Sequence, residues 1–415
     1  MPGIRIVSES APPHTTIMGE IENGVSAAMD DIIAALTQPL TPEERSPRPK
    51  DAEEAPRIVF SGNLQEVNAF FYKRGWGDGW PIIPPTEEAV AEMLAGTDLP
   101  PDHVVAKIIP RYGKATVEKI AINAVVAGAL PTYMPLLIAG VQAMVDPRTW
   151  FGTWQVSTGA WVPFWIVNGP VRNELHINGG SGALSPGDIA NATIGRAMGL
   201  IIKNIGGARK GIEDMGAYGN PGKYTMVMAE NEEVSPWEPF HVQQGFSRDD
   251  STICLFFQNS FAQIHAYSTD HKGILNSLIY NVPPAKRDGL TLVMINPQLA
   301  KILAKNGWTK DGIARFMKEY ARVPAYRHPN FWPVQSSARY MVRKRPPVNP
   351  EESMALINDP ERVRILVAGG PGNWTALAIG GTMPTEWVTR KLELPANWAK
   401  LVEKYKALVP TYARY

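Results

Sequence analysis

Apolar residues recur every three or four positions along several segments, the pattern of a helix with one buried face. In 20–36 the residues on this face are Ile21, Val25, Met29, Ile32 and Ile33. In 186–204, Ile189, Ile194, Ala197 and Ile201 lie close to one face, and Gly206 and Gly207 end the helix. Further helices are predicted at 63–73, 86–94, 116–130, 133–145, 297–305 and 310–320.

Short apolar runs bounded by loop residues predict strands. They lie at 104–110, 164–167, 225–229, 251–257, 290–295 and 363–368. After residue 289 a strand, helices and a strand follow one another, which is typical of an α/β layer. The sequence therefore predicts a mixed α/β fold, with a larger N-terminal α/β domain over 58–288, a smaller C-terminal α/β unit over 289–415 and an N-terminal arm over 1–57.

The arm differs in composition from the rest of the chain. Its segment 41–57 is charged and proline-rich, which is typical of a linker. The single amphipathic helix before it is not stable alone in water. We therefore expect the arm to wrap the body or another subunit of a homo-oligomer; a disordered tail is the alternative.

One stretch, 120–145, carries no charge and is long enough to span a membrane. It is interrupted by Gly128, Pro131, Pro135 and Gly140, and the two prolines frame a turn. Two buried helices joined by a tight connection are therefore expected instead of a membrane span. The N-terminus also lacks the charged and then apolar pattern of a signal peptide.

The net charge and the cysteine count exclude several classes of partner and site. Lys and Arg number 41 and Asp and Glu 40, so the net charge is +1. A nucleic-acid-binding protein needs a basic surplus that displaces counterions, so we expect no nucleic-acid partner. The single cysteine, Cys254, lies in an apolar strand and excludes both an internal disulfide and a cysteine-rich zinc site. A reducing, cytoplasmic environment is therefore expected.

A glycine-rich run, 178–187, directly precedes the helix predicted from Pro186. The first N–H groups of a helix are unpaired, and its dipole favours negative charge there. Ser185 is the expected N-cap. The candidate anion-binding residues are Gly180, Ser181, Gly182, Ser185, Asn191 and Arg196. In the alternative, the glycines serve close packing and Arg196 pairs with a carboxylate.

The densest polar cluster, 230–241, follows a predicted strand, and its prolines prevent a helix. A carboxylate beside an imidazole can do acid/base work when burial tunes both groups. Glu230 or Glu232 is the candidate base, His241 the proton carrier, and Trp237 a neighbouring binding residue. A solvated loop with one satisfied histidine is the alternative.

Other candidates are isolated. Asp78, between glycines and tryptophans, is a candidate site residue or a turn residue. His265 and His271 flank Asp270, but nothing fixes their geometry, so no metal site is expected. Gly370-Pro-Gly372 follows a strand and is a tight turn or a point of close ligand approach. The sequence names no cofactor.

Six segments resemble a known family. They are 75–86 (GWGDGWPIIPPT), 121–125 (AINAV), 168–170 (NGP), 190–197 (ANATIGRA), 219–224 (GNPGKY) and 229–239 (AENEEVSPWEP). The chain resembles the large proteins associated with UGSC-type thiol or selenol proteins, over about residues 65–390. The resemblance implies redox or carbon–heteroatom chemistry with a thiol or selenol partner protein. However, Ala129 stands where a family cysteine is expected, so thiol chemistry must either come from a partner or be lost.

These observations predict an enzyme, or the large subunit of one, acting on a small polar or anionic molecule by acid/base chemistry of the lyase, hydratase or hydrolase kind. Lys223, in the 219–224 segment, joins the anion-binding candidates. We expect Glu230 and Arg196 to face one pocket. The alternatives are thiol- or selenol-dependent reductive cleavage with a partner subunit, and a non-catalytic ligand-binding or scaffold subunit.

Overall fold

The computed structural model describes residues 5, 7, 17–46, 56–286, 288–328, 349–381 and 385–408. The chain divides into two compact units. The described residues up to Ser61 belong to the first unit, and those at 62–328, 349–381 and 385–408 belong to the second. Each unit is described by itself.

The first unit contains the helix predicted for the arm, α1 (Met18–Thr37), followed by α2 (Pro42–Arg45). Arg5 connects the two. Its guanidinium donates hydrogen bonds to the carbonyls of Ala35 (3.1 Å) and Gln38 (2.9 Å) at the end of α1 and forms an ion pair with Glu44 of α2 (2.7 Å). A cation at the C-terminal end of a helix satisfies carbonyls that the helix leaves unpaired. The packing of α1 on another subunit stays a prediction.

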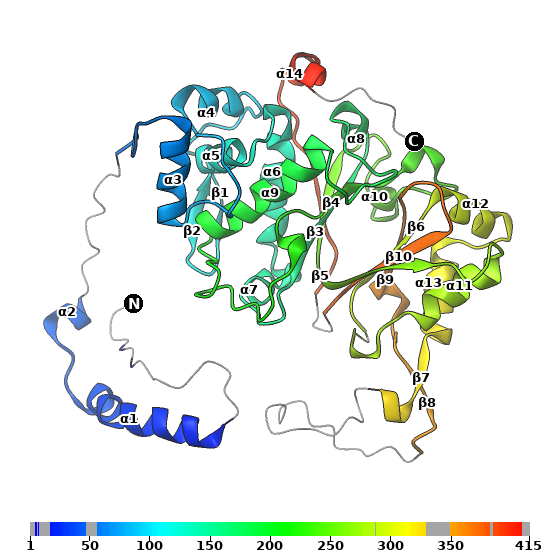
Figure 1. Ribbon diagram of the computed structural model, residues 1–415, viewed down its shortest axis with the longest axis horizontal. Helices are drawn as coiled ribbons and strands as arrows, with labels where there is room; N and C mark the ends of the chain where they lie inside the picture. Colours follow the sequence, from blue (N-terminus) through cyan, green and yellow to red (C-terminus); the bar gives the residue numbers. More distant parts are fainter. Residues whose placement is uncertain are drawn as a thin grey trace. The chain divides into compact units, whose positions relative to one another are not determined.

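The second unit is built on a curled mixed sheet, seen edge-on between the helices in Figure 1. The order of the strands is β4-β3-β5-β10-β6-β9, and β11 also pairs with β5. Only β3–β4 and β6–β9 are parallel pairs among the described strands. The bounds are β3 (Val162–Asn168), β4 (Val227–Ala229), β5 (Thr252–His265), β6 (Thr291–Ile295), β9 (Val363–Val367), β10 (Trp374–Gly380) and β11 (Val388–Lys391).

This topology confirms the mixed α/β class and differs from the predicted division of the body. The first half of β5 pairs with β3 and β11, and its second half pairs with β10 from Trp374↔His265 to Gly380↔Gln258. Strands from 58–288 and from 289–415 therefore share one sheet. The boundary predicted at residue 289 does not separate two folding layers.

Two groups of helices cover the sheet, at opposite ends of its strand order (Figure 1). The first group is α4 (Glu87–Leu94), α5 (Val117–Ala127), α6 (Met134–Met144) and α9 (Ile189–Asn204), and the second is α11 (His271–Tyr280), α12 (Pro297–Lys305) and α13 (Lys310–Tyr320). Alternate residues of β3 serve different cores: Trp165 and Val167 face the first helix group, whereas Phe164 and Ile166 enter a third core on the other face of the sheet.

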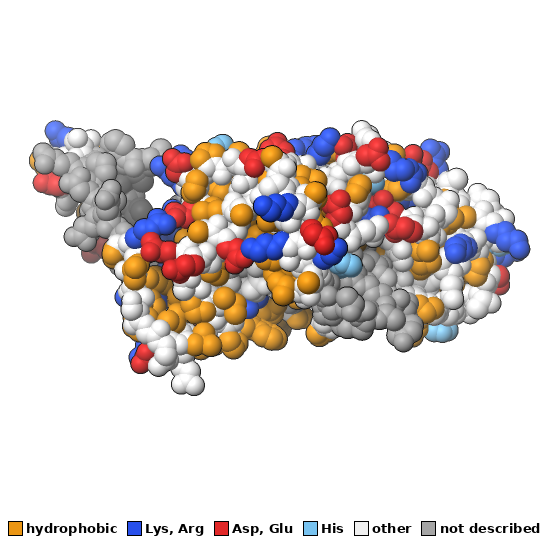
Figure 2. Space-filling view, turned by 90° about the horizontal axis from the view of Figure 1, so that it is seen from above, with side chains coloured by type: hydrophobic (Ala, Val, Ile, Leu, Met, Phe, Trp, Pro, Cys, Tyr) orange, Lys and Arg blue, Asp and Glu red, His pale blue; other side chains and the backbone are white. Residues whose placement is uncertain are grey.

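Shorter elements complete the second unit. They are α3 (Leu64–Arg74), β1 (Val104–Ile108), β2 (Gly113–Thr116), α7 (Phe151–Trp154), α8 (Val171–Glu174), α10 (Phe240–Gln243), β7 (Arg322–Pro324), β8 (Ser353–Ala355) and α14 (Trp398–Tyr405). On the face drawn in Figure 2, acidic and basic side chains are interspersed, as the balanced charge of the chain leads one to expect.

The uncharged stretch 120–145 forms the expected pair of buried helices. They are α5 and α6, joined by a single 3-10 turn at Pro131–Tyr133. Among the described helices, none is both long and apolar enough to cross a membrane.

Asp146, at the end of α6, links the first helix group to β11. Its carboxylate accepts a bidentate pair from Arg148 (2.9 and 2.7 Å) and a further bond from Arg390 (2.7 Å). The hydrogen bonds from Arg148 are the main reason that the pKa of Asp146 falls to about 2.

A depressed carboxyl pKa contributes stability that is complete above the unfolded pKa and is lost as the pH falls through the folded value. We expect Asp146→Asn to cost about 2 kcal/mol of unfolding free energy near pH 7 and about half as much near pH 3. Denaturant unfolding of both proteins at the two pH values measures this. A cost that does not change with pH would contradict the assignment.

Candidate functional site

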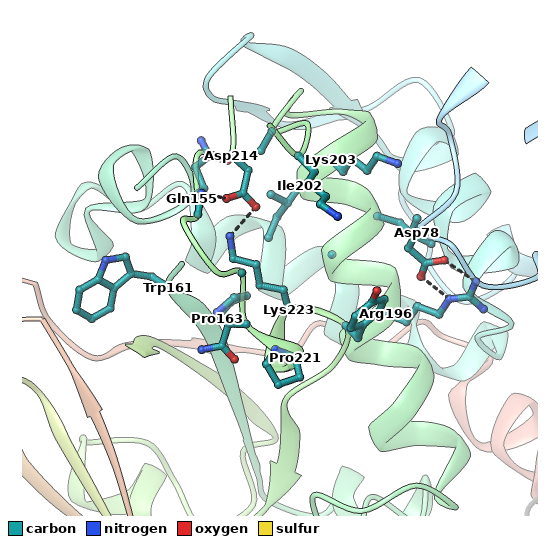
Figure 3. A pocket seen from close by; sticks show the side chains of 18 of the residues that line it. Asp78, Gln155, Trp161, Pro163, Arg196, Ile202, Lys203, Asp214, Pro221 and Lys223 are labelled. Atoms are coloured by element: carbon teal, nitrogen blue, oxygen red, sulfur yellow. Dashed lines mark hydrogen bonds and ion pairs between the residues drawn. The ribbon is translucent and has the colours of Figure 1, made fainter. Parts of the chain in front are cut away.

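A cavity of about 710 Å³ lies in the second unit along one face of α9. Arg196, Gly199 and Lys203 of α9 line it, and their spacing of three, four and seven residues puts them on the same side of the helix. The opposite wall is formed by residues 208–224, and Phe151, Trp161 and Phe257 belong to the apolar part of the lining. Figure 3 shows this arrangement with α9 crossing the cavity.

Arg196 and Asp78 form an ion pair in the wall of the cavity (Figure 3). The guanidinium donates to both carboxylate oxygens of Asp78 (2.7 and 2.9 Å) and to the carbonyl of Pro81 (2.9 Å). This bidentate geometry is the strongest kind of charge-assisted hydrogen bond. Arg196 thus pairs with a carboxylate, as the alternative interpretation of the sequence expected, and it does so within the cavity.

Two further side chains of α9 hold the loop that carries Asp78. Lys203 donates to the carbonyls of Gly75 and Gly77, and Asn204 donates to the carbonyl of Trp76 (3.0 Å). Burial lowers the pKa of Lys203, and the nearby charge of Asp78 opposes this shift. The loop 75–81 is therefore fixed to α9 as one wall of the cavity.

The second ion pair in the cavity is formed by Lys223 and Asp214, 2.5 Å apart (Figure 3). Asp214 also accepts a hydrogen bond from the backbone N–H of Gly216 (3.2 Å). Lys210 lines the same wall and makes no ion pair with any described residue. The cavity thus holds the cations Arg196, Lys203, Lys210 and Lys223 and the carboxylates of Asp78 and Asp214.

The predicted catalytic residues Glu230, Glu232 and His241 lie together, but in a different and closed place. Glu230 is fully buried. Its carboxylate accepts hydrogen bonds from Asn168 (2.7 Å) and from the backbone N–H of Phe240 (2.6 Å), and it forms an ion pair with Lys310 of α13 (3.1 Å). These three partners hold the carboxylate in one position.

Glu232 continues this network. One of its oxygens accepts from the side chain of Asn168 (2.9 Å) and from the backbone N–H of Gly169 (2.8 Å), and it forms an ion pair with Arg172 (2.9 Å). Arg172 also pairs with Glu233 (2.9 Å), and the Arg172 hydrogen bond is the main reason that the pKa of Glu233 falls to about 2.

His241 is fully buried beside this network, and neither ring nitrogen has a hydrogen-bond partner among the described residues. Its Nδ1 lies 3.9 Å from a carboxylate oxygen of Glu232. None of Glu230, Glu232 and His241 is among the described residues that line the cavity.

β3 contributes one residue to each group, near opposite ends of the strand. Pro163, near the start of the strand, lines the cavity, whereas Asn168, at its end, holds Glu230 and Glu232. Five residues of extended strand separate them by roughly 16 Å. The structure therefore does not bring Arg196 and the acidic loop to one pocket, contrary to the expectation from the sequence.

The start of the helix is a second correction. It begins at Ile189 with Asp188 as N-cap, not at Pro186 with Ser185 as cap, because Gly187 has a φ of +137° and interrupts the helical backbone. Asp188 therefore places a carboxylate of the chain itself at the end that was expected to hold an anion. Asn178 binds that carboxylate (2.7 Å).

The other residues of the predicted anion site are outside the cavity lining, and several have partners within the loop. The side chain of Asn191 is saturated by backbone groups of Asn178, Ala183 and Val227. The N–H of Gly180 bonds to Asn178, and that of Ser185 bonds to Gly182. Ser181 packs against the 369–372 turn, where a Cβ on Gly370 would lie 2.6 Å from it. Close packing accounts for Gly179, where a Cβ would lie 2.4 Å from the carbonyl oxygen of Ala229, whereas a Cβ on Gly180 or Gly182 would meet no atom closer than 3.5 Å.

The remaining candidates have structural partners. Trp237 packs on the second helix group and donates to the carbonyl of Trp308 (2.8 Å). Asp270 is the N-cap of α11, and His265 packs edge-on against Trp374. The described residues contain no group of three or more His, Cys, Asp or Glu side chains that could hold a metal ion.

Cys254 is buried in β5, and burial raises the pKa of its thiol to about 12. A thiol of this kind is not a nucleophile at neutral pH.

Several polar residues of the cavity were not identified from the sequence, among them Gln155, Lys203, Lys210, Asp214 and Asn220. A signal was present for one of them, because Lys203 follows Arg196 by seven residues and so shares its face of the helix. Gln155 is the C-cap of α7, and Lys210, Asp214 and Asn220 lie in the loop after α9; no sequence pattern connects these two segments.

Comparisons of the chain with family models, with curated proteins and with solved structures found no match. The site is therefore interpreted from its own geometry.

Proposed function

We propose that the chain is an enzyme, or the large subunit of one, that acts on a small anionic organic molecule bound in the cavity beside α9. The observation that carries this proposal is the set of charges in the cavity: four cations stand against two carboxylates. This leaves a surplus of two positive charges in a partly enclosed, partly apolar space, where electrostatic attraction is screened less than in water. Anionic ligands are the natural complement.

The four cations differ in how many of their N–H donors are free to bind a ligand. Lys210 has no ion pair among the described residues, and Lys223 has one carboxylate partner for three N–H donors. Arg196 and Lys203 are engaged by the 75–81 loop and contribute mainly through their charge. We therefore assign direct anion contacts to Lys210 and Lys223.

Asp214 is the proposed base. It is the carboxylate of the cavity that is not bound to arginine, and it lies 2.5 Å from Lys223. A proton taken from the ligand by Asp214 leaves negative charge on the ligand, which the Lys223 ammonium is placed to stabilise. Acid/base groups in fixed positions contribute roughly a hundred- to ten-thousand-fold in rate, which suits lyase, hydratase or hydrolase-like chemistry.

Isothermal titration of the full-length protein with benzoate, phthalate and inorganic phosphate at low ionic strength tests the proposal. We expect at least one anion to bind, and Lys210→Met and Lys223→Met each to weaken it about tenfold, which is the worth of one hydrogen bond to a charged group.

The control is Lys400→Met on α14, which removes one exposed charge outside the cavity. The proposal fails if no anion binds, or if the control weakens binding as much as the cavity variants do. Binding without turnover of any tested anion would favour a ligand-binding subunit. Turnover only with an added thiol protein would favour the reductive alternative.

A further inference from the structure

The lining of the cavity is apolar at its base and charged toward its opening. Phe151 and Phe257 are buried, and their ring centroids lie 6.0 Å apart. The charged residues come from exposed or half-exposed positions, with Lys210 on the surface. A ligand that fills this space therefore has an apolar body and a charged end.

Aromatic side chains are over-represented in this lining. They are five of the twenty-three lining residues, against 9% of the whole chain. The five are Phe151, Trp161, Tyr218, Tyr224 and Phe257; the side chain of Tyr218 is fully exposed, so the other four rings are those available to a ligand. Aromatic rings prefer offset or edge-to-face contacts with other rings, so this enrichment favours a planar ring over a saturated one.

Trp161 is held in a fixed orientation. Its indole N–H donates to the hydroxyl of Ser157 (3.2 Å), and its ring packs against Trp154 at 4.4 Å. A wall that is already ordered loses little entropy when a ligand docks on it.

We infer that the ligand of this cavity is a planar unsaturated ring that carries two negative charges, such as an aromatic dicarboxylate. The inference rests on the proposed function and deepens it. The ring follows from the aromatic lining, and the two charges follow from the surplus of two cations. Lys210 and Lys223 are the expected partners of the acidic groups.

Four acids separate the two parts of the inference: phthalate, benzoate, cis-cyclohexane-1,2-dicarboxylate and cyclohexanecarboxylate. Isothermal titration of the full chain is expected to rank phthalate first. Loss of one carboxylate is expected to weaken binding about tenfold or more. Saturation of the ring is expected to weaken it about threefold or more.

Variants connect each preference to its residues. Trp161→Leu is expected to reduce the preference for the unsaturated ring, and Lys210→Met the preference for two charges. The matched controls are Trp374→Leu, at an exposed tryptophan of β10, and Lys400→Met. Both controls are expected to keep the preferences of the parent protein.

The outcomes are distinguishable. If neither the four acids nor inorganic phosphate binds, the proposed function fails; if phosphate alone binds, the inference about the ring is contradicted. If they bind through Lys223 but the saturated dicarboxylate equals phthalate, the ring is contradicted and the proposed function stands. If benzoate equals phthalate, the second charge is contradicted.

Discussion

Replacing Lys310 with methionine is expected to lower the free energy of unfolding by about 3–5 kcal/mol. Lys310 is 4% exposed, and its ammonium is 3.1 Å from the fully buried carboxylate of Glu230. Methionine fills a similar volume but leaves Glu230 charged, buried and without its countercharge. Denaturant unfolding followed by tryptophan fluorescence measures the loss.

Two further proteins make this test specific. Lys318 lies on the same helix and pairs with Glu319 at the surface (3.8 Å), so Lys318→Met is expected to cost less than about 1 kcal/mol. Adding Glu230→Gln to Lys310→Met removes the orphaned charge and is expected to recover part of the loss. Equal costs for the two lysine variants would show that the buried pair does not stabilise the fold.

Gly169→Ala is expected to lower the free energy of unfolding by about 3 kcal/mol, from backbone strain and overpacking together. Gly169 has a φ of +85°, and a Cβ there would lie 2.1 Å from the carbonyl oxygen of Asp250. The residue also sits inside the acidic network, where its N–H binds Glu232 and its carbonyl accepts from Arg172. A shifted backbone therefore loosens these bonds as well.

Gly219 provides the matched control. Its φ is +72°, but an added Cβ meets nothing within 4 Å. Gly219→Ala is therefore expected to cost about 1 kcal/mol, from strain alone. The difference between the two variants isolates the steric clash, and a difference near zero would contradict the close approach of Gly169 to Asp250.

Local signals predicted most of the longer helices of the second unit, but not α11 or α14. The helix predicted at 86–94 is α4, and Thr86 is its N-cap, with its hydroxyl accepting from the N–H of Ala89 (3.2 Å). The predicted helix 310–320 has the bounds of α13. Such elements are set by side chains within a few residues of one another, so a single sequence contains the information.

Contacts between distant segments were not predictable in the same way. The second half of β5 was missed because polar residues interrupt the apolar run from Gln258 to His265. Its partner, β10, lies more than a hundred residues later in the chain. The Ser185-Pro186 signal for a helix start was wrong because Gly187 has a backbone conformation that no propensity scale contains.

For the candidate site, too, the sequence identified residues but not how the fold arranges them. The sequence identified Asp78, Arg196 and Lys223, all of which line the cavity. It also identified Glu230, Glu232 and His241 as a group, and these lie together. It could not show that β3 separates the two sets or that Lys310, from α13, neutralises Glu230, because both facts depend on tertiary packing.

The central claim is that ligands bind beside α9 and that the acidic network is structural. Its most direct test is the affinity of phthalate, or of whichever anion binds most tightly, for Lys223→Met and for Glu232→Gln, each checked for folding by circular dichroism. We predict a loss of about tenfold for Lys223→Met and less than about twofold for Glu232→Gln, since a residue outside the cavity makes no contact with the ligand. A larger loss of affinity for Glu232→Gln than for Lys223→Met would contradict this claim and would indicate that the ligand binds at the acidic loop.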